Sequence, residues 1–210
     1  MIDVYWSAKG GVGTSVVAAA TALMSAADGV ATLLVDLDGD QPAILGLASS
    51  SGPGVGGWLD AGHDVPVDAL AELETSVVPN LGLLPRGIGA ITDPERLSLL
   101  GSVLAGSGRR VIVDAGPTGP SQWWAGRAES VLVVRACYLA VLRVGRVPAG
   151  TQLVLIEEPG RALRLDDIMA ATGASLRCRV ALDPAVARSV DAGLFTTRLP
   201  RSLRPLGRRR

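Results

Sequence analysis

A glycine-rich segment near the N-terminus has the residue types needed to bind a phosphate group. Glycine lets successive backbone amides turn toward one anion, and a helix that begins after such a loop adds the positive end of its dipole. A hydroxyl at the end of the loop can bind Mg²⁺. The segment consists of Gly10, Gly11, Val12, Gly13, Thr14 and Ser15. Its spacing predicts a phosphate-binding loop between a strand and a helix.

Three aspartates complete this set of candidate residues. Asp36 and Asp114 each end a short apolar run, and Asp38 follows two residues after the first. Carboxylates at the carboxyl ends of buried strands lie where ligands bind in open α/β sheets. They can hold Mg²⁺ through water or orient a water for phosphoryl transfer. The alternative is that Asp36 or Asp38 only caps a turn.

The elements that must position these residues alternate along the chain. We expect strands at residues 2–6, 31–35, 76–78, 81–84, 110–113, 131–134, 152–156 and 176–182. We expect helices at residues 16–27, 56–61, 67–73, 94–106, 138–147, 165–172 and 184–191. Such alternation predicts an α/β fold with a mostly parallel central sheet and helices on both faces.

Composition and charge restrict the class of protein. The 210 residues include 20 basic and 20 acidic side chains, and 48% are hydrophobic, which is typical of a globular chain. The apolar runs are too short to cross a bilayer, and no signal peptide is recognisable. Cys137 and Cys178 lack a metal-ligand spacing, and a lone histidine, His63, argues against a histidine-based metal site or triad. We expect both cysteines to be reduced and buried in a cytoplasmic protein.

The neutral total charge conceals an uneven distribution. Residues 198–210 contain six arginines and no acid, so residues 1–197 carry 14 basic and 20 acidic side chains, a net charge of −6. We therefore expect a nucleotide-binding domain at 1–197 and an arginine-rich tail at 198–210. Pro205 is expected to break a helix in the tail. A solvated tail, an anionic membrane contact and DNA binding are the alternatives for it.

The basic residues also differ in type. Lys9 is the sole lysine beside 19 arginines, and it directly precedes the glycines. The pattern Lys-Gly-Gly-Val-Gly-Thr-Ser resembles the deviant Walker A motif of the ParA/MinD ATPases, and most closely the CpaE/TadZ pilus-assembly and septum-associated group. The strand ending at Asp114 resembles a Walker B strand, and residues 183–193 resemble the family's final loop and helix. The resemblance covers nearly the whole chain.

The resemblance implies a three-layer P-loop NTPase fold that binds ATP or ADP with Mg²⁺. It assigns Ser15, Asp36 and Asp114 to the metal and Asp38 to the attacking water. Lys9 would reach the phosphates of the other subunit in an ATP-sandwich homodimer. The loop residues would hold the phosphates, and backbone groups of Leu182 and Asp183 would read the base.

Two departures from the family pattern affect this assignment. Thr14 stands where the ordinary phosphate loop has a lysine, and losing a charged donor to phosphate costs roughly 1.5–3 kcal/mol. Glu157 and Glu158 stand where relatives often place an asparagine that reads adenine. Slow hydrolysis at most is therefore the expectation.

The function implied is a nucleotide-dependent positioning or assembly factor for pilus, secretion or division machinery, cytoplasmic or peripheral to the inner face of the membrane. A non-hydrolysing scaffold and a ParA-like DNA partition factor are the alternatives. Trp123 and Trp124, after the Walker B-like strand, either pack under the neighbouring loop or form an exposed patch, and the former is favoured.

Overall fold

The computed structural model describes residues 1–48, 52–62, 65–66, 68–117, 124 and 126–207. Eight strands form one sheet in the order β3-β4-β2-β5-β1-β6-β7-β8. The strands are β1 (Ile2–Trp6), β2 (Thr32–Asp36), β3 (Thr75–Val78), β4 (Leu81–Leu84), β5 (Arg110–Asp114), β6 (Glu129–Arg135), β7 (Gln152–Glu157) and β8 (Ser175–Ala181). All neighbours pair in parallel except β3 and β4, which form an antiparallel hairpin at one edge.

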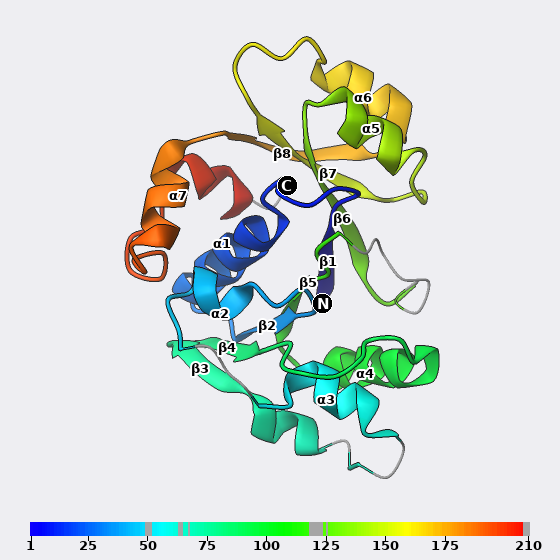
Figure 1. Ribbon diagram of the computed structural model, residues 1–210, viewed down its shortest axis with the longest axis vertical. Helices are drawn as coiled ribbons and strands as arrows, with labels where there is room; N and C mark the ends of the chain where they lie inside the picture. Colours follow the sequence, from blue (N-terminus) through cyan, green and yellow to red (C-terminus); the bar gives the residue numbers. More distant parts are fainter. Residues whose placement is uncertain (49–51, 63–64, 67, 118–123, 125, 208–210) are drawn as a thin grey trace.

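Helices cover both faces of this sheet, as Figure 1 shows. The α-helices are α1 (Thr14–Ala27), α2 (Gln41–Ile44), α3 (Gly54–Asp60), α4 (Pro94–Gly106), α5 (Tyr138–Val144), α6 (Leu165–Thr172) and α7 (Pro184–Asp191). The 3-10 helices are η2 (Asp68–Leu73) and η4 (Arg201–Gly207). The predicted α/β fold, with a mostly parallel central sheet between layers of helices, is confirmed.

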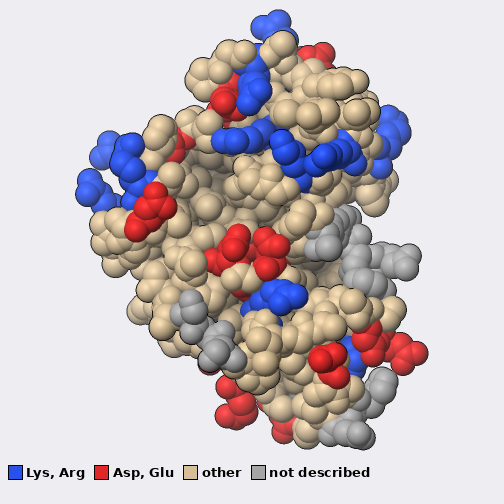
Figure 2. Space-filling view, in the orientation of Figure 1, with Lys and Arg blue, Asp and Glu red and all other residues tan. Residues whose placement is uncertain are grey.

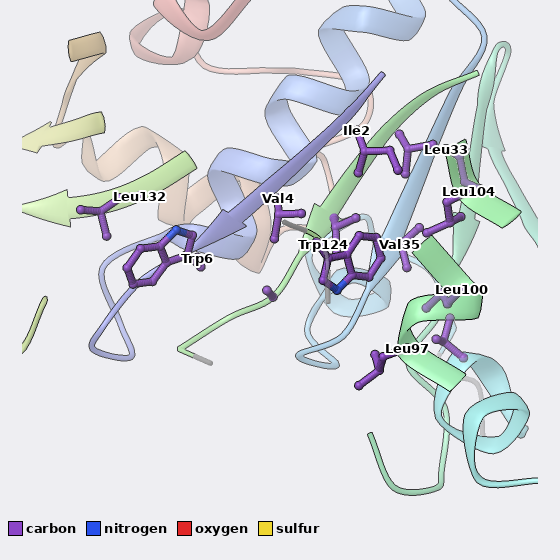
Figure 3. Close-up of a cluster of buried hydrophobic side chains, with 14 of the residues drawn as sticks. Ile2, Val4, Trp6, Leu33, Val35, Leu97, Leu100, Leu104, Trp124 and Leu132 are labelled. Atoms are coloured by element: carbon purple, nitrogen blue, oxygen red, sulfur yellow. The ribbon is translucent and has the colours of Figure 1, made fainter. Parts of the chain in front are cut away.

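The central strands are buried on both faces, so the sheet divides the core in two. On one face Ile2, Val4 and Trp6 of β1 belong to one apolar cluster with residues of α3, α4 and α6. Figure 3 shows these β1 residues on the side of the sheet that α4 covers. On the other face Tyr5 packs with α1, α2 and the C-terminal segment. Trp124 is buried in the first cluster, and the nearest atom of its ring would lie 3.7 Å from a Cβ built at Gly101. Trp124 is thus buried, as favoured, and does not form an exposed patch, whereas Trp123 lies outside the described residues.

Several boundaries differ from the expectations. The helix expected at 138–147 ends at Val144, because Gly145 adopts φ 59° and ψ −153°, a conformation outside the helical region. The segment expected as a helix at 67–73 is the 3-10 helix η2, and Val67 is not among the described residues. The short helix α2 was not predicted. Cys137 and Cys178 are free, but both are partly exposed, so the expectation that they are buried is wrong.

The described part of the arginine-rich tail packs against the domain. Leu203 and Leu206 of η4 are 2% and 5% exposed, and they belong to the same apolar cluster as α1 and β8. Pro205 lies inside η4, a short 3-10 helix, which does not contradict the expectation that this proline interrupts a longer helix. A tail solvated along its whole length is likewise excluded, because burial of two leucines holds residues 201–207 in place. The proposed domain boundary at 197 stays a prediction.

No helix within the described part of the chain is both long and apolar enough to cross a membrane.

Candidate nucleotide and magnesium site

The glycine-rich loop joins β1 to α1 at the carboxyl edge of the sheet. Gly11 and Gly13 have φ of 75° and 97°, a left-handed conformation that glycine adopts without strain. A Cβ built at Gly10, Gly11 or Gly13 would meet no atom within 4 Å, so open space lies in front of the loop. Val12 is 5% exposed and anchors the loop in the core. The loop therefore offers its backbone, and not the Val12 side chain, to a ligand.

Two of the predicted carboxylates come from adjacent strands. Asp36 ends β2 and Asp114 ends β5, and the two residues are register partners in the parallel ladder. Both side chains are fully buried. The amide of Leu37 donates to the carbonyl of Asp114 at 2.9 Å, which joins the two strand ends. The sheet thus brings together two residues that are far apart in the sequence.

Backbone amides donate hydrogen bonds to both carboxylate oxygens of Asp36. Its Oδ1 accepts hydrogen bonds from the amides of Asp38 at 3.0 Å and Gly39 at 2.6 Å. Its Oδ2 accepts from the amide of Gln41 at 3.1 Å. These contacts are those of a turn cap, the alternative considered for this residue. A metal role for Asp36 stays a prediction, and it would compete with three donors.

Gln41, at the start of α2, connects the buried carboxylates to the loop. Its Nε2 donates to the carboxylate Oδ2 of Asp114 at 2.8 Å and to the backbone carbonyl of Ser15 at 3.0 Å. The side chain is fully buried, and its Oε1 has no hydrogen-bond partner among the described residues. Gln41 was not predicted as a site residue. The sequence Asp40-Gln41-Pro42 carries the signal that could have found α2, since proline is favoured in the first turn of a helix.

Asp38 lies in front of this buried pair, at the surface. Its carboxylate lies over Gly116, where a built Cβ would be 2.3 Å from Asp38 Oδ1. Gly116 itself has φ 56°, and its amide donates to Asp114 Oδ1 at 3.2 Å. A side chain at position 116 would therefore displace Asp38. Gly116 is a second positioning residue that the sequence did not single out for this role.

Burial in this region disfavours ionised carboxylates. Burial raises the pKa of Asp114 to about 6, against hydrogen bonds from Gln41 and Ser15 that lower it. The pKa of Asp36 is raised mainly by burial, although three backbone amides oppose the rise. The pKa of Asp38 is raised by partial burial and by the charge of Asp40, while a hydrogen bond from Ser15 lowers it. A cation in this region would favour the ionised forms.

Ser15 thus lies between the loop and the acids, because hydrogen bonds from its hydroxyl lower the pKa values of both Asp38 and Asp114. Hydroxyl and carboxylate oxygens are the ligands that Mg²⁺ prefers. Among the described residues, however, no group of three or more His, Cys, Asp or Glu side chains is arranged to hold a metal ion. A magnesium ion here would therefore draw most of its ligands from water and phosphate oxygens.

The two positions that depart from the ordinary phosphate loop differ in exposure. Thr14, the first residue of α1, is 6% exposed, and its Oγ1 has no hydrogen-bond partner among the described residues. Lys9 is exposed at the start of the loop, and Ser7 Oγ donates to its carbonyl at 3.0 Å. An unpartnered hydroxyl beside an open loop can donate a hydrogen bond to a phosphate oxygen. The residues present therefore fit a nucleotide phosphate, with one charge fewer than usual.

The base-reading residues predicted from the resemblance lie across the sheet. Leu182 and Asp183 follow β8, and strands β6 and β7 separate β8 from β1, about 14 Å at ordinary strand spacing. The amide of Leu182 donates to the carbonyl of Glu157 at 2.7 Å. The side chain of Glu157 pairs with Arg179 (Nε to Oε1, 2.8 Å), and Glu158 pairs with Arg161 at 2.7 Å. Both glutamates that replace the family's asparagine position are therefore charge-paired.

Solved structures identify the fold. A ParA family ATPase from Chlorobium tepidum is 20% identical, with a TM-score of 0.78, covering 98% of this chain and 96% of that one. The fold is that of the ParA and MinD ATPases. The MinD of the MinC:MinD cell division complex from Aquifex aeolicus is 20% identical (TM-score 0.75, covering 91% and 86%). The septum site-determining protein MinD from Pyrococcus horikoshii, complexed with Mg-ADP, is 17% identical (0.73, covering 98% and 93%). No protein-family model and no curated protein matches the sequence.

Proposed function

We propose that this chain is a nucleotide-dependent positioning or assembly factor of the ParA/MinD type that binds ATP or ADP with Mg²⁺. The observation that supports it most is the position of Ser15, which ends an open glycine loop and hydrogen-bonds to the carboxylates of Asp38 and Asp114. A structurally similar MinD is complexed with Mg-ADP. When bound, the nucleotide would supply a phosphoanhydride to cleave.

The proposed residue roles come from the resemblance, and the geometry of the site is compatible with them. Backbone amides of the loop would bind the phosphates, Ser15 would ligate the metal, and Asp114 would hold metal-bound water. Asp38, fixed over Gly116, would orient the attacking water. The exposed ammonium of Lys9 would reach the phosphates of a second copy, the deviant Walker A role.

Such a dimer would act on a partner protein, and the resemblance to the CpaE/TadZ group favours pilus-assembly or secretion machinery. The factor would be cytoplasmic or would attach to the inner face of the membrane. A structurally similar MinD is solved with MinC, which supports a partner-binding role.

The experiment combines nucleotide affinity with oligomeric state. ATP and Mg²⁺ should bind the wild type by calorimetry and double its mass by light scattering. Ser15→Ala should weaken binding only when Mg²⁺ is present, and Lys9→Ala should keep binding but abolish the dimer. Arg143→Ala, which removes an exposed cation from α5, is the matched control and should dimerise. Dimerisation of Lys9→Ala at wild-type levels would refute the role of Lys9.

A second candidate, a non-hydrolysing scaffold of the same fold, is favoured by one observation. The position of the usual loop lysine holds the buried hydroxyl of Thr14, which carries no charge to oppose that of the reacting phosphates. A phosphate-release assay separates the two. Turnover that Asp38→Asn abolishes supports the ATPase, whereas tight ATP binding without release above a blank supports the scaffold.

A further inference from the structure

A hollow of about 710 Å³ lies between α7 and η4, at the C-terminal side of the molecule. Four arginines line it, together with Asp183 and the apolar residues Leu194 and Leu199. The arginines are Arg188, Arg198, Arg201 and Arg204. Figure 2 shows basic side chains gathered at the edge of the molecule where Figure 1 places α7. One hollow thus collects four of the 19 arginines of the chain.

None of these arginines forms an ion pair with the described residues, although the charge of Arg188 attracts the carboxylate of Asp183. The described ion pairs use other arginines, for example Arg109 with Glu74 at 2.7 Å and Arg177 with Asp3 at 2.9 Å. Asp183 supplies the one carboxylate that lines the described part of the hollow, and its Oδ1 already accepts the amide of Ala185 at 2.8 Å. With four arginines and one carboxylate along its lining, the hollow therefore carries a net positive charge.

That charge does not hold the fold together. All four arginine side chains are exposed, whereas η4 is anchored by the buried Leu203 and Leu206. Like charges in one hollow repel one another and weaken the folded state slightly. An arrangement that costs stability and forms no ion pair within the described residues is suited to an external anion.

We propose that this hollow binds a ligand that carries two or more phosphoryl groups. The planar fork of each guanidinium matches a phosphoryl group with two parallel hydrogen bonds, and four forks exceed what one phosphate needs. The volume falls in the ordinary range of small-ligand sites. Leu194, 46% exposed, and Leu199 offer apolar surface to the organic part of the ligand. None of the lining residues belongs to the glycine loop, although Asp183, which the resemblance assigns to base reading, is one of them. The recessed shape favours a compact ligand over a duplex.

Calorimetric titration of the full chain with tripolyphosphate tests the proposal. We expect Arg201→Ala/Arg204→Ala to lose one binding site, or at least tenfold in affinity at that site. The matched control, Arg143→Ala/Arg146→Ala, removes two exposed arginines from the α5 region and should bind like the wild type. Circular dichroism should show that both variants are folded. Wild-type binding by Arg201→Ala/Arg204→Ala would overturn the proposal, since the remaining site would be the glycine loop.

Two further titrations identify the source of the phosphoryl groups. Vesicles containing a phosphatidylinositol bisphosphate, compared with phosphatidylcholine vesicles, test a lipid headgroup. Sedimentation with the former that tripolyphosphate competes away supports a headgroup, and tripolyphosphate binding without sedimentation supports a soluble ligand. Duplex DNA that binds more tightly than tripolyphosphate, in a way that Arg201→Ala/Arg204→Ala abolishes, would overturn the small-ligand proposal in favour of a nucleic-acid surface.

Discussion

Two regions of the molecule differ in whether their charged side chains are buried or exposed. At the carboxyl ends of β2 and β5, Asp36 and Asp114 are fully buried and accept hydrogen bonds from amides and from Gln41. Beside α7 and η4, four arginines are exposed and no acid among the described residues pairs with them. The first region is polar inside, and the second is apolar inside and charged outside.

The two regions also differ in whether the residues that stabilise the fold are the same residues that could bind a ligand. In the first, the groups suited to a ligand also build the local structure, because Asp36 shapes the turn that carries Asp38. In the second, Leu203 and Leu206 hold the segment while the arginines remain free. Substitution should therefore alter stability and function together in the first region, and separately in the second.

Removing an apolar anchor of the second region should have the largest effect. Leu203→Ala deletes a side chain that is 2% exposed, and a buried Leu→Ala change costs about 2–5 kcal/mol. Urea denaturation measures it, with Leu194→Ala as the control, since Leu194 is 46% exposed and should cost less than about 1 kcal/mol. Equal losses in the two variants would mean that η4 is not anchored by burial.

The pH dependence of the first region should be nearly as large. The pKa of Asp114 is raised to about 6 from an ordinary 3.8, so between those values the folded chain holds a proton that the unfolded chain has released. The free energy of unfolding without nucleotide or metal therefore falls as pH rises through this window, by up to about 3 kcal/mol. Urea denaturation at pH 5 and pH 7 measures the upper part of this change, about 1.3 kcal/mol.

Asp114→Asn should remove most of this dependence, and the part that remains belongs to Asp36 and Asp38, whose pKa values are also raised. The control is Asp60→Asn, at the exposed end of α3, which should keep the wild-type dependence. A free energy that rises between pH 5 and pH 7 in the wild type would contradict the burial of an ionisable Asp114.

The sequence predicted the elements that carry local signals. Asp93 and Asp183 each precede a proline, and both accept amides at the starts of α4 and α7, as expected of caps. Continuous apolar runs predicted the buried strands, and the ends of two strands placed Asp36 and Asp114 at one edge. The candidate site follows from such rules, because a parallel sheet gathers its strand ends.

What the sequence did not predict depends on tertiary contacts. Gln41 sits in a four-residue helix, too short for a periodic pattern, and its role appears only when Ser15 and Asp114 lie beside it. The leucines of η4 lie among arginines and a proline, so composition suggested a solvated tail. Their burial depends on surfaces of α1 and β8 that are distant in sequence.

Replacing Gln41, whose side chain joins Asp114 to Ser15, should have an intermediate effect on the free energy of unfolding. Gln41→Leu removes the donor to Asp114 and Ser15 at similar side-chain size, and leaving a buried acceptor unpaired costs about 1–3 kcal/mol. It should also raise the pKa of Asp114 further, since the hydrogen bond from Gln41 lowers it. Gln152→Leu, at a partly exposed contact with Arg177, is the control for the same replacement. A smaller loss in Gln41→Leu than in Gln152→Leu would show that the bridge does not support the site.

The smallest effect should come from the arginines themselves. Arg201→Ala/Arg204→Ala should change the free energy of unfolding by no more than about 0.5 kcal/mol, because both side chains are exposed and neither forms an ion pair with the described residues. The sign should be slightly stabilising at low salt, where repulsion within the hollow is least screened, and the gain should vanish near 1 M NaCl. Urea denaturation at both salt concentrations measures this. A loss as large as that of Leu203→Ala would mean that the arginines hold η4 in place, and it would remove the contrast between a region built by its charges and a region that only displays them.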